Sequence, residues 1–223
     1  MHVAASHQTR KPALNEKETP MKLYYSPGAC SLSPHIALAE AGLSADYVKV
    51  DLRGKKTEAG DDYLKVNPKG QVPVLDIGGE TLTEGPAIVQ FIADKAPDKK
   101  LAPANGTIER YRLQEWLNLI TSELHKSFSP LFNPAMSDDT KNAYRTKISS
   151  TFAYVDGKLA GKDYLMGSQF TVADGYLFTI LRWALAMKFD LAQWPNLKAY
   201  FDRVGARPKV KEAMLAEGLI KAA

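Results

Sequence analysis

Apolar and polar residues alternate differently in the two halves of the chain, and the first half begins with strand-like runs. Residues 22–25 (KLYY) and 46–50 (DYVKV) are short runs typical of strands. Between them, residues 31–41 begin with serine and proline and are followed by Gly42, which predicts a helix. The opening pattern therefore predicts a βαβ unit.

A hairpin and a second helix follow a charged, irregular segment at 51–67, in which we expect one short helix. The runs PVLDI and ETLT flank Gly78-Gly79, a pair that favours a tight hairpin turn. A helix is predicted from about residue 86 to residue 95. The order βαβ and then ββα predicts an α/β thioredoxin-like domain over residues 21–96.

After residue 96 the hydrophobic pattern is helical. Residues 97–106 combine prolines, a glycine and charges, so we expect a linker. Apolar residues then recur at helical spacing at about 107–128, 138–160, 171–188, 195–204 and 208–216. The sequence therefore predicts an all-α, helical C-terminal domain over residues 107–223.

One helix start in this domain has a recognisable cap. Thr171 followed by Asp174 resembles a capping box, in which two side chains satisfy free backbone groups at the start of a helix. Phe170 precedes the cap and could pack against the next turn. We interpret this pattern as a folding signal without a catalytic role.

Composition and charge exclude several kinds of function but do not indicate one. Of the 223 residues, 45% are apolar and 24% charged, and the net charge is +4. Lys and Arg are interspersed with Asp and Glu, which argues against a nucleic-acid partner. No apolar run is long enough to span a membrane. With one cysteine and four histidines, we expect no metal site.

The first twenty residues have no apolar segment like that of a secretory signal. We expect residues 1–20 to be a disordered extension ahead of Met21. A single cysteine excludes an internal disulfide framework. A cytoplasmic protein with a reduced thiol is the simplest interpretation.

The only cysteine, Cys30, lies between the Pro27-Gly28 turn and the first predicted helix. A helix N-terminus has free N–H groups and a partial positive charge, which favour a thiolate. We therefore expect Cys30 to be partly ionised near neutral pH, and either nucleophilic or able to hold another sulfur by a hydrogen bond. The alternative is a small apolar side chain that only fills space. Since one cysteine cannot form a CxxC disulfide, an active thiol would need a second thiol from outside, such as glutathione.

Two further segments fit a glutathione site. Pro73 begins a predicted strand, and a cis bond after Val72 would aim the backbone of Val72 at an extended peptide; an ordinary loop proline is the alternative. Glu84 and Gly85 lie at another helix N-terminus, where N–H groups can approach a carboxylate and Glu84 could hold an ammonium group. The γ-glutamyl end of glutathione carries both of those groups.

Together these segments resemble the cytosolic glutathione S-transferases, and most of all the bacterial beta class. The resemblance covers residues 21–223 and rests on LYYSPGACSLSPHI, NPKGQVPVL, TEGPAIVQFIAD, EWLNLITSELHKSFSPLF and FTVADGYLFTILRWA. It implies a detoxifying enzyme with glutathione as co-substrate and no permanently bound cofactor. It also implies a homodimer, with an electrophile pocket between the glutathione site and the helical domain.

The resemblance assigns roles to particular residues. Cys30 would contact the glutathione sulfur, with Tyr25 and Ser31 as hydroxyl donors near it, although the tyrosine is thought not to be essential in this class. The residues that would hold the tripeptide are Cys30, Lys55, Val72, Pro73, Glu84 and Gly85.

The helix predicted at 107–128 would supply the remaining site residues. Its spacing places Asn118, Ser122 and His125 on one polar face. The resemblance implies that Asn118 and Glu123 reach the glutathione of the partner subunit and that His125 lies near the sulfur. Trp183 would line the electrophile pocket or else belong to the core.

The predicted reaction is conjugation of the glutathione thiolate to small hydrophobic electrophiles, with peroxidase activity or thiol–disulfide exchange through Cys30 as additional activities. The alternatives are a glutaredoxin-like thioltransferase working through a Cys30–glutathione mixed disulfide, and a non-catalytic module of the same fold that binds a protein partner. A helix end contributes about 0.3–1 kcal/mol, less than the about 1.4 kcal/mol of one pKa unit. Hydrogen bonds must therefore supply most of any large fall in the thiol pKa.

Overall fold

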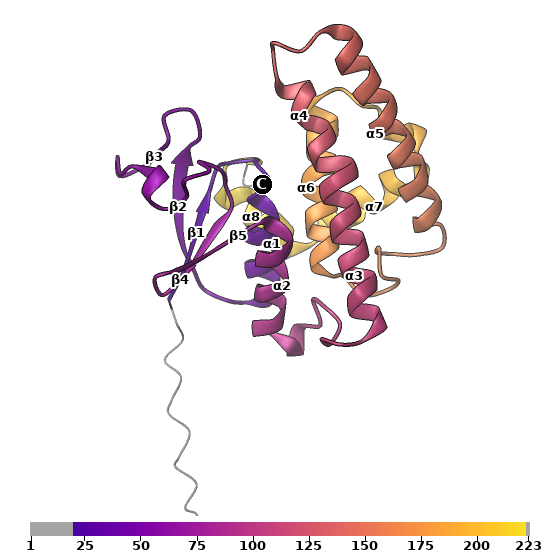
Figure 1. Cartoon of the computed structure of the whole chain (residues 1–223). Coiled ribbons are helices and arrows are strands. Elements are labelled where there is room, and N and C mark those ends of the chain that lie inside the picture. The colour runs from indigo at the N-terminus through magenta and orange to yellow at the C-terminus, as the bar shows by residue number, and fades with distance from the viewer. Residues whose placement is uncertain (1–19, 222–223) are drawn as a thin grey trace, which may run out of the picture.

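The computed structural model describes residues 20–221 and shows a sheet domain beside a bundle of helices (Figure 1). The extension predicted for residues 1–20 lies outside the described residues, apart from Pro20. Within residues 20–221 no helix is long and apolar enough to cross a membrane.

The N-terminal domain has the predicted βαβ–ββα order. Its five strands lie in the order β3-β2-β1-β4-β5, with β1 parallel to β2 and antiparallel to β4. The elements are β1 (Met21–Tyr25), α1 (Leu32–Ala41), β2 (Asp46–Asp51), β3 (Lys56–Thr57), η1 (Tyr63–Lys65), β4 (Val74–Ile77), β5 (Glu80–Thr83) and α2 (Gly85–Lys95).

Glycine residues end helices and join strands of this domain at the places that the sequence predicts. Gly42 ends α1 with a φ of 68°, a left-handed conformation that favours glycine. Gly78 and Gly79, both with positive φ, join β4 to β5 as an antiparallel hairpin. The charged segment at 51–67 is irregular as expected, with a short helical turn, and it also contributes the edge strand β3.

The C-terminal domain is helical, and its helices lie at the predicted places. Its elements are η2 (Pro97–Lys99), α3 (Ile108–Leu119), η3 (Ile120–His125), α4 (Lys126–Phe132), α5 (Asp138–Leu159), α6 (Val172–Ala186), η4 (Leu191–Gln193), α7 (Pro195–Ala206) and α8 (Pro208–Ala216). The helix predicted at 107–128 is not one regular α-helix, because η3 is a π-helical turn between α3 and α4.

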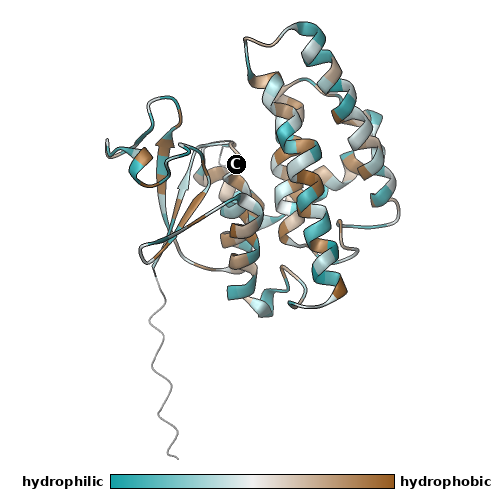
Figure 2. Cartoon of the chain, in the orientation of Figure 1, coloured by the Kyte–Doolittle hydropathy of each residue, from teal (hydrophilic) through white to brown (hydrophobic). Residues whose placement is uncertain are grey.

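The two domains share one hydrophobic core. Helix α1 packs against α2 within the N-terminal domain and against α6 and α8 of the C-terminal domain. Figure 2 shows many hydrophobic residues on α1 and α2, which lie between the sheet and the helical bundle. A Cβ atom at Gly175 would lie 3.2 Å from a methyl group of Ile36, so glycine permits this close approach of α6 to α1.

The predicted capping box at the start of α6 is confirmed. The Asp174 carboxylate accepts hydrogen bonds from the Thr171 N–H at 2.8 Å and from the Leu165 N–H at 2.9 Å. It also accepts one from the Tyr200 hydroxyl at 3.0 Å. Asp174 is fully buried, so these hydrogen bonds take the place of the water that would otherwise solvate its carboxylate.

Candidate functional site

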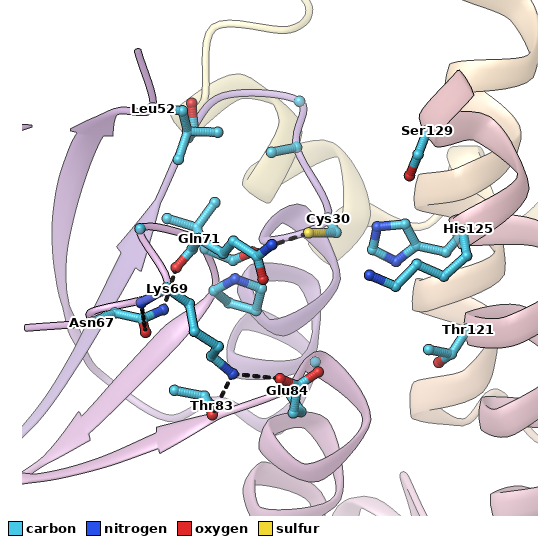
Figure 3. A pocket seen from close by; sticks show the side chains of 18 of the residues that line it. Cys30, Leu52, Asn67, Lys69, Gln71, Thr83, Glu84, Thr121, His125 and Ser129 are labelled. Carbon is cyan, nitrogen blue, oxygen red and sulfur yellow. Dashed lines mark hydrogen bonds and ion pairs between the residues drawn. The ribbon is translucent and has the colours of Figure 1, made fainter. Parts of the chain in front are cut away.

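An open pocket of about 880 Å³ lies between the two domains. Two sets of residues line it, and each set comes from one domain (Figure 3). We call the first the N-terminal wall: Ser26–Cys30, Leu52, Arg53, Lys55, Asn67, Lys69–Pro73 and Thr83–Pro86. We call the second the helical wall: Thr121, His125, Lys126, Ser129, Phe132, Tyr176 and Trp183.

The Cys30 thiol lies on the N-terminal wall and is protonated. Its Sγ donates a hydrogen bond to the Val72 carbonyl at 3.2 Å. Burial raises the pKa of Cys30 to about 11, and the N–H groups of Cys30 and Ser31 offset this only in part. The expectation that Cys30 is partly ionised near neutral pH is therefore wrong for this unliganded structure, because desolvation outweighs the helix end.

The loop that carries Cys30 is held by the C-terminal domain. The Gly28 N–H donates to Glu217 Oε2 at 2.9 Å, and the Gly28 carbonyl accepts from Trp183 Nε1 at 2.8 Å. Glu217 is buried and also pairs with His35 Nδ1 at 3.0 Å. Sequence reasoning missed Glu217, because 189 residues separate it from its partner Gly28.

The loop before β4 lies beside Cys30. The Val72–Pro73 bond is cis, as the sequence suggested. The Tyr63 hydroxyl and the Asn67 side-chain amide donate to the Gln71 carbonyl at 2.8 and 2.7 Å. The Lys55 ammonium donates to the Gly70 carbonyl at 2.8 Å, which fixes this lysine at the pocket edge.

Glu84 lies at the far end of the N-terminal wall, just before α2. Its φ of 67° is unusual for a residue with a side chain. The carboxylate accepts a hydrogen bond from Lys69 Nζ at 2.6 Å, and this partner lowers the pKa of Glu84. Sequence reasoning missed Lys69, because only the folded loop brings it next to Glu84. Gly85 begins α2 and lines the pocket beside them.

The π-helical turn determines which side chains form the helical wall. Thr121 and His125 line the pocket, whereas Asn118 and Ser122 are exposed and lie outside it. The sequence predicted that Asn118, Ser122 and His125 share one face. That prediction assumed regular α-helical spacing, and the wider π-turn changes it.

His125 points from the helical wall toward Cys30 (Figure 3). Its Nδ1 lies 2.6 Å from the hydroxyl of Tyr176 on α6. Burial, with a smaller contribution from the charge of Lys126, lowers the pKa of His125 to about 4. The imidazole is therefore neutral at physiological pH, and it can donate or accept a hydrogen bond without carrying a charge.

Aromatic rings line the pocket beside His125. Trp183 meets His125 edge to face at 4.9 Å between ring centroids and meets Phe132 at 5.4 Å. Phe132 is 47% exposed, which makes it an apolar surface at the pocket rim. Trp183 therefore lines the pocket and also packs against the core.

The structure brings some predicted residues together and leaves others outside the pocket. Inside are Cys30, Lys55, Val72, Pro73, Glu84, Gly85, His125 and Trp183. Outside are Tyr25, Ser31, Asn118 and Glu123.

Three of those four residues have other partners. Tyr25 packs edge-on against His35 and Tyr47. The Ser31 hydroxyl is buried, and it accepts from the Ser26 N–H at 3.1 Å and donates to the Ser26 carbonyl. Glu123 pairs with Lys147 on α5 at 3.1 Å.

No cluster suited to a metal ion occurs among residues 20–221: no group of three or more His, Cys, Asp or Glu side chains has the required arrangement. The Cys30 thiol and the Glu84 carboxylate line the pocket from the N-terminal wall, and the His125 imidazole lines it from the helical wall.

Comparison with known proteins gives consistent matches over both domains. Residues 19–94 match the family model described as glutathione S-transferase, N-terminal domain, and residues 119–208 match glutathione S-transferase, C-terminal domain. The chain is 48% identical over 200 residues to glutathione S-transferase GstA of Escherichia coli O157:H7, covering 89% of this chain and 100% of that protein.

Solved structures of glutathione S-transferases are also similar to this chain. BphK, described as a bacterial glutathione S-transferase in a ternary complex, superimposes with a TM-score of 0.87 at 60% identity, covering 88% of this chain and 99% of BphK. The bacterial beta class glutathione S-transferase of Sphingomonas chungbukensis gives a TM-score of 0.86 at 52% identity, covering 89% of this chain and 100% of that one.

Proposed function

The chain belongs to the glutathione S-transferase family and is a glutathione transferase with glutathione as its co-substrate, and we propose how its pocket holds the tripeptide and acts on the sulfur. Glutathione lies along the N-terminal wall, with its thiol between Cys30 and His125. The facing positions of these two side chains across one pocket carry the proposal (Figure 3).

The N-terminal wall offers a seat for each part of the tripeptide. Glu84 holds the γ-glutamyl ammonium, and the N–H groups at the start of α2, beginning at Gly85, receive the γ-glutamyl α-carboxylate. The backbone of Val72 pairs with the cysteinyl residue. Lys55 and Arg53, which both line the pocket, attract the glycyl carboxylate.

Two neutral hydrogen-bond donors then face the sulfur. The Cys30 S–H turns from the Val72 carbonyl to the incoming sulfur, and His125 donates its ring N–H from the opposite wall. A hydrogen bond to a charged group is worth roughly 1.5–3 kcal/mol, against about 1.4 kcal/mol for one pKa unit. These donors can therefore lower the thiol pKa further than a helix end alone.

Conjugation proceeds from that thiolate. The proton of the glutathione thiol passes to water, and the sulfur lone pair attacks an electrophilic carbon whose leaving group departs with its electron pair. Phe132 and Trp183 lie next to His125 and give the electrophile an apolar surface. Small hydrophobic electrophiles fit this arrangement best.

Thiol–disulfide exchange is a second candidate activity, because Cys30 lies in the open pocket. The Cys30 thiol would first lose its proton to water, and its sulfur would then attack a glutathione mixed disulfide, releasing the other thiolate and forming a Cys30–glutathione disulfide. A second glutathione thiolate would then release oxidised glutathione and restore Cys30. Peroxidase activity would instead send the glutathione thiolate to a peroxide oxygen, and a second glutathione would complete the reduction.

We also propose a cytoplasmic homodimer. Ile108 and Tyr111, which are 63% and 59% exposed at the start of α3, are apolar side chains that a second subunit could cover. The roles predicted for Asn118 and Glu123 concern the second subunit and stay predictions. Tyr25 and Ser31 have no place in the proposed sulfur site, because they lie outside the pocket.

The test combines a calorimetric titration with reduced glutathione and two assays, one for conjugation to a chlorodinitrobenzene and one for exchange with a mixed disulfide. We expect binding between micromolar and millimolar and measurable conjugation by the wild type. Absence of glutathione binding would overturn the proposal and favour the non-catalytic module. Exchange that is fast while conjugation is barely detectable would favour the thioltransferase.

A further inference from the structure

We propose that Tyr176 holds His125 in the tautomer with its proton on Nε2, which makes His125 a hydrogen-bond donor to the glutathione sulfur and not the base that removes its proton. This inference rests on the proposed function for the place of the sulfur. The tautomer itself is a property of the unliganded protein. Tyr176 is in this account a positioning residue.

The first observation is the distance between Tyr176 and His125. The Tyr176 hydroxyl lies 2.6 Å from His125 Nδ1, although the two residues are 51 positions apart. Tyr176 is only 3% exposed, so water does not compete freely for its hydroxyl. One proton lies between the two atoms, donated either by the phenol or by the imidazole.

Thr121 helps to decide which atom donates. Its hydroxyl donates to the Leu117 carbonyl at 2.7 Å, so its single proton is already used. The Tyr176 hydroxyl can therefore donate either to Thr121 Oγ1 at 3.4 Å or to His125 Nδ1 at 2.6 Å. The contact of 2.6 Å is shorter than the about 2.7–3.2 Å of hydrogen bonds from N–H donors and lies within the about 2.5–3.0 Å of those from hydroxyl donors, so the phenol donates to Nδ1.

The charges around His125 agree with a neutral ring that accepts at Nδ1. The charged or titratable groups that face it are Lys126 beside it, Glu84 and Cys30 from the N-terminal wall, and Tyr176. Burial keeps Tyr176 protonated by raising its pKa, and His125 is neutral at physiological pH. A neutral imidazole that accepts at Nδ1 must carry its proton on Nε2.

Packing holds the ring in this orientation. His125 meets Tyr176 edge to face at 5.9 Å and Trp183 at 4.9 Å. Turning the ring over would break the contact at Nδ1. The Nε2–H group is thus available to the sulfur, and the ring has no free lone pair with which to take the thiol proton.

Nuclear magnetic resonance of the ¹⁵N-labelled full chain tests the tautomer directly, without glutathione. Two-bond ¹⁵N–¹H correlations of the imidazole should show an unprotonated Nδ1 and a protonated Nε2 for His125. In Tyr176→Phe we expect a mixture of both tautomers, while the correlations of His35, whose Nδ1 pairs with Glu217, should not change. A protonated Nδ1 in the wild type, or an unchanged His125 spectrum in Tyr176→Phe, would overturn the proposal.

Kinetics test the consequence for the reaction. Tyr176→Phe should lower kcat for conjugation about three- to tenfold while changing glutathione affinity less than about twofold. Tyr154→Phe, at an exposed tyrosine on α5, is the matched control and should have no effect. The same loss when Tyr176→Phe is added to His125→Ala would show a purely structural role and overturn the proposal.

His125→Gln separates donor from base. A glutamine amide can place an N–H near the Nε2 position but cannot act as a base at neutral pH. We expect His125→Gln to retain clearly more activity than His125→Ala. Equal losses in the two variants would support a base and contradict the proposal. If glutathione binds neither the wild type nor any variant, the proposed function is wrong, but the NMR experiment still tests the tautomer.

Discussion

The two walls of the pocket are built in different ways. The N-terminal wall depends on short loops and turns, in which Gly28, Val72 and Glu84 each follow or precede a regular element. The helical wall depends on side chains brought together from η3 and α6, such as His125 and Tyr176. The first wall offers backbone groups and charges suited to a peptide, and the second offers neutral polar and aromatic groups.

This difference predicts separate roles for the two walls. The N-terminal wall carries Lys55, Lys69 and Glu84, whose charges match the ends of glutathione. On the helical wall, His125 is neutral and lies among aromatic rings. Changes in the first wall should therefore alter glutathione affinity, and changes in the second should alter the state of the sulfur.

Cys30→Ala should depart most from this separation of roles, because Cys30 lies on the N-terminal wall but carries a reactive thiol. We expect disulfide exchange to fall by at least about a thousandfold, since the attacking sulfur is lost. Conjugation should fall only about three- to tenfold, because one of the two donors to the sulfur is lost while His125 still faces it. Parallel assays of both reactions measure the effect. Exchange at the wild-type rate would remove Cys30 from the chemistry.

Asp174→Ala should damage the helical wall by loosening α6, which carries Tyr176 and Trp183. The change leaves the buried donors of Thr171, Leu165 and Tyr200 without their acceptor. We expect the free energy of unfolding to fall by about 3–4 kcal/mol, as for a broken buried network. Denaturant unfolding measures it.

Asp139→Ala is the control for that variant, because Asp139 is exposed in the first turn of α5. It should cost less than about 1 kcal/mol. Equal losses from the two variants would contradict the role of the buried cap.

Glu84→Gln should weaken glutathione binding without changing the state of the sulfur. Removing one charge from the proposed ammonium seat should raise the Kd for glutathione about ten- to thirtyfold, an effect of roughly 1.4–2 kcal/mol that is limited by the exposure of the site. Calorimetric titration measures it. Glu80→Gln, at the exposed start of β5, should stay within about twofold. An unchanged Kd with a reduced kcat would contradict the role of Glu84 in binding and indicate a role in the reaction.

The smallest effect concerns pH. The folded-state pKa of His125 is about 4, below the about 6.5 of an unfolded histidine. Between these values the unfolded chain binds more protons, so stability falls as pH drops from about 6.5 through 4. After allowance for partial exposure, this loss should be about 1–2 kcal/mol larger in the wild type than in His125→Gln. Thermal unfolding at pH 7 and pH 4.5 measures it, and a pH-independent difference would contradict a buried neutral ring.

Sequence reasoning captured the parts of the molecule that local patterns determine. Glycine turns, alternating strands and helical periodicity placed the elements of both domains, and the Thr171–Asp174 cap was visible as a motif. Most of the N-terminal wall could be predicted in the same way, because Cys30, Pro73 and Glu84 lie in short segments whose local chemistry is distinctive.

The remaining features depend on contacts that no local pattern contains. The π-turn at η3 interrupts a sequence with ordinary helical periodicity, so the neighbours of His125 were assigned to the wrong face. Glu217 meets Gly28 across the domain boundary, and Tyr176 meets His125 from another helix of the same domain, 51 residues away. The raised pKa of Cys30 reflects burial, which depends on the packed structure and not on the residue's place beside a helix.

We expect the N-terminal wall to bind glutathione, and His125 on the helical wall to set the charge on its sulfur together with Cys30. The most direct measurement is the pKa of bound glutathione, followed by thiolate absorbance at saturating glutathione in the wild type, His125→Ala and Glu84→Gln. We expect His125→Ala to raise this pKa by about one unit, the value of one hydrogen bond to the thiolate, and Glu84→Gln to leave it unchanged. A pKa that moves in Glu84→Gln and stays constant in His125→Ala would contradict the account.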